Sequence, residues 1–259
     1  MMSDKSRKVF ISKTAVKAIE ARVANYFKMY PKALDAAKMI IDSEEYQIVP
    51  ADNFIKSWAA DRNSNSIFEL AFSATDNISI NGLAYIYRFS GSSGKGYGDI
   101  SVTENLYTIY EDSDVRKDVI GEVPGNPGYI QNLKKYPDMN GYDNVVVIRY
   151  EEMVLIYAEA LLNTNPGEAL TWLNKIPENR GATPYTVATL DNVILERRKE
   201  LAFEGFRFDD LVRTGRGIPK VEFDQNIEAS IPAGDYRLAY PIPKTELDAN
   251  SNMVQNEGY

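Results

Sequence analysis

Apolar side chains recur at steps of three and four residues along residues 11–43, which is the spacing of one helix face. Pro31 interrupts this run and fits the first turn of a new helix, so the pattern predicts a helical hairpin. The apolar faces of its two helices comprise Val16, Ile19, Val23, Tyr26, Phe27 and Tyr30, and then Ala33, Leu34, Ala37, Ile40 and Ile41. A lone hairpin cannot cover both of its sides, and we expect it to pack against the later helices or against a further N-terminal segment.

Two more helices are predicted in the later half of the chain. The apolar positions of the first are Tyr150, Met153, Val154, Tyr157, Leu161 and Leu162. Residues 165–168 then combine a capping asparagine, a proline for the first turn and a glutamate in the capping-box position, which indicates the start of the second helix. Its apolar face continues to Ile176, and we expect residues 177–184 to form a connector.

The next helical period carries an unusual mixture of charged and aromatic residues. It begins at Leu190 and breaks at Gly205, which predicts a second short helix over Phe206–Arg213. The mixed stretch itself is Glu196–Gly217, ERRKELAFEGFRFDDLVRTGRG.

The charged residues of this stretch are compatible with an ion-pair network or with a catalytic acid–base cluster. Glu200, Glu204 and Arg207 are spaced to share one helix face, and Arg213 could fold back toward them. Arginine suits such pairing, because its planar guanidinium group can satisfy a carboxylate at two points. We favour the structural network, since charged residues at helical spacing usually form a solvated or paired face.

Residues 44–146 are predicted to be rich in loops, with one strand, Ser66–Phe72, in which apolar residues alternate. The segment SGSSGKGYG lacks the residue order of a phosphate-binding loop, and we interpret it as a surface loop. Aromatic rings in irregular segments are suited to stacking on sugar rings, while polar neighbours reach hydroxyl groups. The candidate ligand-binding residues are Trp58, Asn81, Tyr85, Tyr87, Arg88, Tyr97, Asp99 and Tyr107. Each of them could instead serve only in packing.

Composition restricts the chemistry. The formal net charge of −8 argues against nucleic acid as a partner. The chain contains no Cys and no His, which excludes thiolate nucleophiles, Ser-His-Asp triads and nearly all zinc catalysis. Asp112 and Asp114 alone lack the remaining ligands of a calcium-binding loop. We therefore expect no catalytic residue, no metal site and no cofactor, and no apolar run approaches the ~20 residues of a membrane helix.

Three motifs follow one another in the later half of the chain. They are Val147–Leu162, VIRYEEMVLIYAEALL; the charged stretch Glu196–Gly217; and Tyr240–Tyr259, YPIPKTELDANSNMVQNEGY. Together they resemble the signatures of the SusD/RagB family of outer-membrane nutrient-binding lipoproteins. The hairpin of residues 11–43 is similar to a tetratricopeptide-type helix pair, which that family also carries.

The resemblance implies a mostly α, SusD-like fold of tetratricopeptide-type hairpins with long irregular loops and a few short strands. It implies a single domain over residues 1–259. The parts of that domain are the hairpin 11–43, a loop-rich ligand-binding region 44–146, and a C-terminal helical scaffold and tail 147–259. We expect the family's signal and lipidated cysteine to lie outside this sequence, and membrane association to depend on that N-terminal lipid anchor.

The resemblance also implies a function, which is non-catalytic capture of nutrient glycans at the surface of the outer membrane. The captured glycan would be delivered to a SusC-like TonB-dependent transporter. Peptide capture by the same type of uptake system is one alternative. A tetratricopeptide-like scaffold for a protein partner is another, and a large exposed apolar groove on the hairpin would favour it. A carboxylate-based glycosidase is the most distant alternative.

Overall fold

The computed structural model describes residues 8–88, 96–98, 100–123, 126–223 and 225–259. The chain forms two compact units, Met1–Gly205 and Phe206–Tyr259. A single domain over residues 1–259 remains a prediction made from the sequence.

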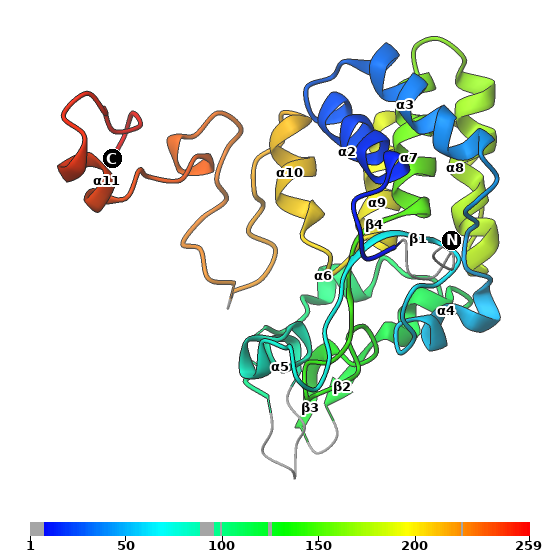
Figure 1. The fold of residues 1–259 in the computed structure, drawn as a ribbon, viewed down its shortest axis with the longest axis horizontal. Coiled ribbons are helices and arrows are strands. Elements are labelled where there is room, and N and C mark those ends of the chain that lie inside the picture. Colours follow the sequence, from blue (N-terminus) through cyan, green and yellow to red (C-terminus); the bar gives the residue numbers. More distant parts are fainter. Residues whose placement is uncertain (1–7, 89–95, 99, 124–125, 224) are drawn as a thin grey trace. The chain divides into compact units, whose positions relative to one another are not determined.

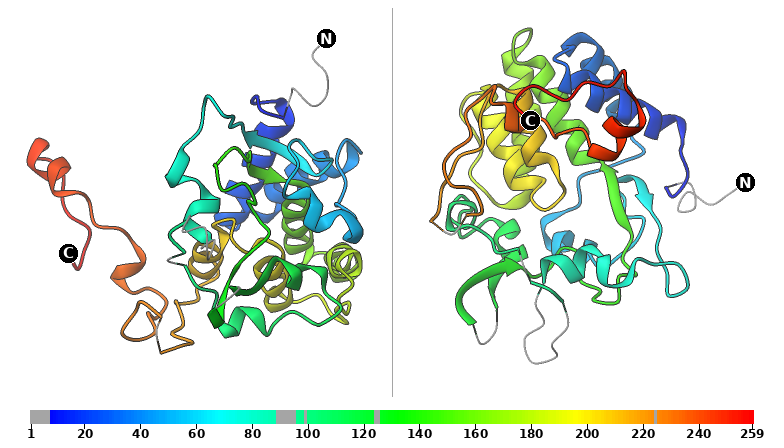
Figure 2. Two further views of the ribbon diagram at one scale, coloured as in Figure 1. Left: turned by 90° about the horizontal axis from the view of Figure 1, so that it is seen from below. Right: turned by 90° about the vertical axis from the view of Figure 1, so that its left-hand side faces the viewer.

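Helices are the main regular elements of the first unit (Figure 1). They are α2 (Lys13–Tyr26), α3 (Tyr30–Asp42), α4 (Ala51–Ser57), α5 (Leu83–Tyr87), α6 (Glu104–Tyr107), α7 (Tyr150–Leu161), α8 (Pro166–Arg180) and α9 (Leu190–Glu200). Helices α2, α3, α7 and α8 lie at one end of this unit, away from α5 (Figure 1 and Figure 2). None of the helices that the structure describes is long and apolar enough to cross a bilayer.

Two antiparallel pairs of strands complete the first unit. They are β1 (Ser66–Leu70) with β4 (Val145–Arg149), and β2 (Ile120–Val123) with β3 (Asn126–Asn132). Strands β2 and β3 lie at the same end as α5 (Figure 1). The mostly α fold with a few short strands, predicted from the sequence, is confirmed.

Helix α7 is the centre of the first unit and packs against α2, α3, α8 and α9. Every residue from Tyr150 to Leu161 is buried. The helix also carries Glu151, Glu152 and Glu159 into the interior, where a carboxylate needs a hydrogen-bond or charge partner.

The predicted hairpin is confirmed, because α2 and α3 pack against each other and against α7. The prediction of which face α2 buries is wrong. The residues that α2 buries include Ala15, Ala18, Ala21 and Ala24. The exposed residues include Val16, Ile19, Val23 and Tyr26, followed by the C-cap residue Phe27. Small side chains at the contact let two helices approach closely. Arg22 adds a charge-assisted contact, since its Nε lies 2.6 Å from Oε1 of the buried Glu152.

Helix α8 begins as the capping pattern predicts. The side chain of Asn165 accepts from the backbone N–H of Glu168 at 3.3 Å, and the Glu168 carboxylate accepts from Asn165 Nδ2 at 2.9 Å. The sequence predicted a connector over residues 177–184. This prediction is wrong for its first residues, because α8 continues through Pro177 to Arg180. It ends at Gly181, whose φ of +74° is the left-handed conformation that favours glycine.

The second unit contains α10 (Phe206–Arg213), at the predicted position, and α11 (Lys244–Ala249). Its final residues return to the segment that precedes α11. The side chain of Gln255 accepts from the backbone N–H of Ile242 at 2.8 Å and donates to the carbonyl of Ile242 at 3.0 Å. This pairing explains physically why two separated parts of the Tyr240–Tyr259 motif occur together.

Candidate functional site

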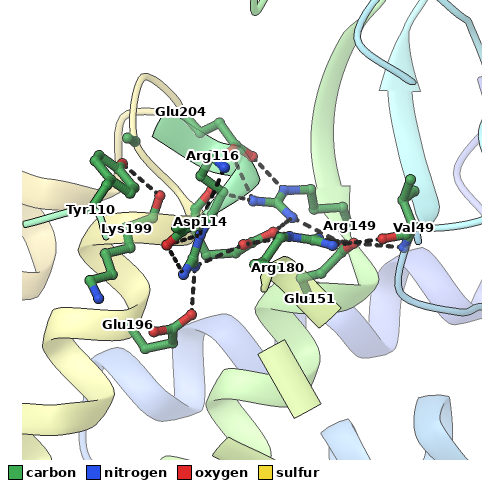
Figure 3. Close-up of polar contacts among 12 residues, drawn as sticks. Val49, Tyr110, Asp114, Arg116, Arg149, Glu151, Arg180, Glu196, Lys199 and Glu204 are labelled. Carbon is green, nitrogen blue, oxygen red and sulfur yellow. Dashed lines mark hydrogen bonds and ion pairs between the residues drawn. The ribbon is translucent and has the colours of Figure 1, made fainter. Parts of the chain in front are cut away.

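Three buried arginines, Arg116, Arg149 and Arg180, converge in the first unit (Figure 3). Each is bonded to the carboxylate of Glu200, at 3.1, 2.7 and 2.9 Å respectively. Burial acts to raise the pKa of Glu200, but the guanidinium groups of Arg180, Arg149 and Arg116 hold it well below its ordinary value. Glu200 is therefore an ionised carboxylate at the centre of a buried ion-pair network.

Further carboxylates also pair with the three arginines (Figure 3). The pairs are Arg116 with Asp114 and Glu196, Arg149 with Glu204, and Arg180 with Glu151. These side chains come from β4, α7, α8, α9 and the segments beside them, so the network connects most of the helical scaffold. Among the described residues, no group of three or more acidic side chains is arranged to hold a metal ion.

The network supports the structural interpretation of the charged stretch and corrects its geometry. Helix α9 ends at Glu200, and the chain turns through Phe203 (φ +68°) and Gly205 (φ +84°). The prediction that Glu200 and Glu204 share one helix face is therefore wrong. Glu204 turns back to Arg149, whose Nε and Nη2 donate to its two oxygens at 2.8 and 2.9 Å.

The sequence contains no local signal for the three arginines. They are separated from Glu200 by 84, 51 and 20 positions, so no helical period connects them. In the second unit, Arg213 donates to Asp210 at 2.7 Å within α10. The pairing of arginines with carboxylates was predictable, whereas the identity of most partners was not.

A buried lysine and an aromatic cluster lie beside the network. Lys135 Nζ donates to Glu204 Oε1 at 2.6 Å and lies 4.3 Å from the centre of the Trp58 ring. The rings of Phe54 and Tyr136 meet Trp58 edge to face, at centroid distances of 6.1 and 6.0 Å. Trp58, a predicted ligand-binding residue, is thus half-buried among neighbours that pack on its ring.

Lys135 gives the stability of the fold a pH dependence. Burial lowers the pKa of Lys135 from 10.5 to about 8, although the charge of Glu204 opposes this shift. Between these two values the unfolded chain binds more protons than the folded chain, so the free energy of unfolding rises with pH. Relative to Lys135→Met, the wild type should gain roughly 1–2 kcal/mol between about pH 7.5 and about pH 9.5. Urea denaturation at both pH values measures this gain, and an unchanged difference between the two proteins would contradict it.

Three further predicted residues are half-buried. Tyr87 stacks on Tyr136 with ring centroids 6.3 Å apart. Arg88 donates to a backbone carbonyl at 2.7 Å. Tyr107 lies in α6, with the ammonium group of Lys117 at 5.2 Å from its ring centre. Packing or hydrogen bonding already engages part of each of these side chains.

Tyr85 and Tyr97 form an aromatic pair at the surface. Their ring centroids are 4.9 Å apart and their planes are inclined by 80°. Tyr97 is 48% exposed, and Tyr85 is half-buried. Asn81, in the turn that precedes α5, is exposed, whereas Asp99 lies outside the described residues. The structure therefore places two of the predicted aromatic residues together, with the larger exposed surface on Tyr97.

The backbone around Tyr97 is held from two sides. The N–H of Tyr97 donates to the carbonyl of Tyr85 at 2.8 Å. The carbonyl of Gly98 accepts from the hydroxyl of Tyr129 at 2.6 Å and from the side chain of Gln131 at 2.9 Å, both on β3. An aromatic ring on a segment fixed in this way loses little conformational freedom when a ligand binds.

Comparison with known proteins connects the scaffold to a family. A sequence model of the SusD family matches residues 126–259, which is more than half of the chain. This chain belongs to the SusD family. SusD-like protein P38 of Formosa agariphila is 37% identical over 155 residues, which cover 52% of this chain and 30% of that protein. The starch-binding protein SusD of Bacteroides thetaiotaomicron is 32% identical over 128 residues, which cover 48% of this chain and 22% of that protein.

A solved structure extends the similarity over nearly the whole chain. A SusD superfamily protein from Bacteroides thetaiotaomicron superposes with a TM-score of 0.84 at 29% identity, covering 98% of this chain and 62% of that one. The chain therefore spans less than two thirds of the length of these relatives. The match to the SusD family begins at residue 126, so it contains most of the ion-pair network and lies after the Tyr85–Tyr97 pair.

Proposed function

We propose that this SusD-family protein binds glycans without acting on them, through the surface formed by Tyr85 and Tyr97. The observation that carries the proposal is the exposed ring of Tyr97 on a backbone segment held by Tyr85, Tyr129 and Gln131. Aromatic faces of this kind pack against the C–H surfaces of sugar rings, while the phenol hydroxyl remains available for hydrogen bonds. A relative that is named a starch-binding protein supports glycan as the ligand class.

The other predicted residues either contact the ligand or support the binding surface in this proposal. Asn81, which is exposed, is the polar residue that we expect to reach sugar hydroxyls, and Asp99, predicted from the sequence for the same role, lies outside the described residues. Four of the predicted residues are half-buried, namely Trp58, Tyr87, Arg88 and Tyr107. We propose that they support the binding surface and that only their exposed edges contact the ligand. The non-catalytic part of the proposal rests on the absence of Cys and His from the sequence. It also rests on the buried carboxylates around Glu200, which are matched by arginines.

Delivery of the bound glycan to a SusC-like TonB-dependent transporter at the outer-membrane surface belongs to the same proposal. Membership of the SusD family supports it. Peptide capture is the alternative ligand class for the same system, and it would use backbone pairing at a strand edge rather than ring faces.

Affinity electrophoresis through gels that contain single polysaccharides, beginning with starch, tests the proposal. We expect at least one polysaccharide to retard the chain relative to a gel without polysaccharide. Unchanged mobility in every gel, together with binding to a peptide library, would replace the glycan proposal by peptide capture.

Gly96 provides a test of how Tyr97 is positioned. Its φ is +87°, and a Cβ at this position would lie 2.0 Å from the carbonyl oxygen of Arg88. Gly96→Ala should therefore displace the segment that carries Tyr97 and weaken glycan binding by roughly tenfold. Gly234→Ala is the matched control, because Gly234 has a φ of +80° but nothing within 4 Å of the added Cβ. Equal glycan affinity of the two variants would show that the position of Tyr97 does not matter.

A further inference from the structure

A loop formed by residues 137–143 lies against the proposed glycan surface. Arg88, which directly follows α5, donates from Nη1 to the carbonyl oxygen of Pro137 at 2.7 Å. A Cβ built on Gly96, next to the exposed tyrosine, would lie 2.9 Å from Cε of Met139. The loop therefore contacts both of the segments that carry the aromatic pair.

Two Asn-Gly pairs meet where this loop touches the turn before α5. They are Asn81-Gly82 and Asn140-Gly141. A Cβ built on Gly82 would lie 3.3 Å from Cα of Gly141, whose φ of +76° favours glycine. Both asparagines are exposed. Since neighbouring Cα atoms are only about 3.8 Å apart, this contact brings the two amides to one region of the surface.

Asp138 fixes the side-chain amide of Asn140. Its Oδ1 accepts from the backbone N–H of Asn140 at 2.8 Å and from Nδ2 of the same residue at 2.9 Å. Within the described part of the chain no further hydrogen bond engages this amide, so its second N–H and its carbonyl oxygen remain for a ligand. A planar group with one donor and one acceptor matches neighbouring sugar hydroxyls, and its fixed orientation reduces the entropy that binding costs.

Carboxylates dominate the charge on this side of the surface. Asp138 and Asp143 line a small hollow together with Gly82, beside the start of α5. Burial raises the pKa of Asp143, and the charges of Asp138 and Asp61 act in the same direction. A hydrogen bond from the backbone of Asp138 and the charge of Arg88 oppose them. The groups that act on Asp143 thus include two further carboxylates and one cation.

The sequence on either side of Tyr97 adds no net charge. Lys95 and Asp99 lie outside the described residues, and their formal charges cancel. The chain as a whole has a net charge of −8. A glycan with carboxylate or sulfate groups therefore meets like charge at this surface, whereas an uncharged glycan does not.

We propose that this surface selects uncharged glycans, with Asn140 as a further contact residue and with Asp138 and Asp143 as the groups that reject anionic ones. The inference rests on the proposed capture of glycans by Tyr85 and Tyr97. The amide of Asn140 bonds to sugar hydroxyls beside the stacked ring. One carboxylate about 8 Å from an anionic group of the ligand weakens binding by roughly 3- to 30-fold, according to the local dielectric.

Polymers with the same backbone and substituents of different charge test the selection. The probes are hydroxyethyl and carboxymethyl derivatives of starch, galactomannan and β-glucan at equal substitution, with alginate and polygalacturonate as natural polyanions. Biolayer interferometry measures their binding to the whole chain. At about 20 mM salt, at least one hydroxyethyl polymer should bind about tenfold more tightly than its carboxymethyl counterpart, and the difference should shrink at about 0.5 M salt.

Asp138→Asn keeps an acceptor for Asn140 and removes one charge. Relative to the hydroxyethyl polymer, this variant should bind the carboxymethyl polymer at least about threefold more tightly than wild type does. Asp42→Asn is the matched control, because it removes the same charge from an exposed position on α3, at the other end of the first unit (Figure 1 and Figure 2). The control should leave the ratio of the two affinities unchanged.

Asn140→Ala tests the proposed contact with sugar hydroxyls. It should weaken binding of the hydroxyethyl polymer by roughly three- to tenfold, because it removes one exposed hydrogen-bonding group. Asn252→Ala is its control, since Asn252 is exposed and its N–H donates to the side chain of Asn250 at 3.0 Å, as that of Asn140 does to Asp138. Equal affinity of these two variants would overturn the role of Asn140.

The outcomes separate charge selection from glycan capture. Equal binding of the hydroxyethyl and carboxymethyl polymers, or an unchanged ratio in Asp138→Asn, overturns charge selection. Binding of alginate or polygalacturonate as tight as that of any uncharged polymer, and lost in Tyr97→Ala, retains glycan capture and overturns charge selection alone. Binding to none of the polymers overturns glycan capture and the selection with it.

Discussion

Replacing Glu200 by Gln should lower the free energy of unfolding by about 3–5 kcal/mol. The change keeps the size of the side chain but removes the charge that Arg116, Arg149 and Arg180 share. Each buried guanidinium group then faces a neutral amide in place of a carboxylate, although its other carboxylate partners remain, and a hydrogen bond to a charged group contributes about 1.5–3 kcal/mol. Urea denaturation near neutral pH measures the loss directly.

The pH dependence of the same variant provides a second measurement. The folded-state pKa of Glu200 is held well below 4.5, so its contribution to stability is present above the unfolded value and is lost as pH falls toward the folded value. The stability of wild type should therefore approach that of Glu200→Gln as the pH falls below about 4.5. Glu104→Gln, at an exposed position, is the control and should change stability by less than about 0.5 kcal/mol. A Glu200→Gln variant as stable as this control would contradict a structural role for the network.

Replacing Tyr97 by Ala should weaken glycan binding by roughly 10- to 100-fold. Burying an aromatic face against a ligand contributes about 1.5–3 kcal/mol, and each 1.4 kcal/mol corresponds to about a tenfold change in affinity. Tyr97 contacts Tyr85 but belongs to neither buried apolar cluster, so the fold should be retained. Affinity electrophoresis in a gel with the retarding polysaccharide compares the variant with wild type.

Tyr236→Ala is a closely matched control for this experiment. Tyr236 is 48% exposed, as is Tyr97, and it meets Tyr259 at 5.1 Å and 79°, compared with 4.9 Å and 80° for the pair of Tyr97 with Tyr85. The two substitutions therefore remove the same kind of ring from the same kind of contact. Loss of retardation in Tyr97→Ala alone assigns binding to Tyr97, whereas equal loss in both variants would indicate a general effect of losing an exposed tyrosine.

Local patterns were sufficient to predict most of the helical scaffold. The period around Tyr150 gave α7, the cap at Asn165 gave the start of α8, and the break at Gly205 gave α10. These features depend on neighbours within one or two turns, which is the range that periodicity and capping describe. The end of α8 was not predicted, because Pro177 normally indicates a helix boundary and the helix continues through it to Arg180.

Long-range pairing limited what could be inferred about the charged stretch. A carboxylate at Glu200 and arginines nearby suggested an ion-pair network, but its main partners lie at Arg116, Arg149 and Arg180. Their contact depends on how four elements pack, and spacing along one helix contains no information about that. The expected helix face with Glu204 was wrong for the same reason.

The hairpin shows a second limit of pattern analysis. Larger apolar residues such as Val16 and Val23 were expected to face the core of the first unit, but the alanines of α2 do so. A pattern of apolar positions identifies faces that need partners and does not say which partner takes which face. For the candidate binding residues, the sequence identified the aromatic rings, and only the structure separates the exposed Tyr97 from the packed Trp58.

The most direct test of glycan capture by ring stacking is the dissociation constant for an oligosaccharide of the retarding glycan. Isothermal titration calorimetry would compare wild type with Tyr97→Phe and Tyr97→Ala. Binding through the ring face predicts that Tyr97→Phe stays within about threefold of wild type and that Tyr97→Ala is at least about tenfold weaker. Equal dissociation constants for all three proteins would contradict the account and place the glycan elsewhere on the chain.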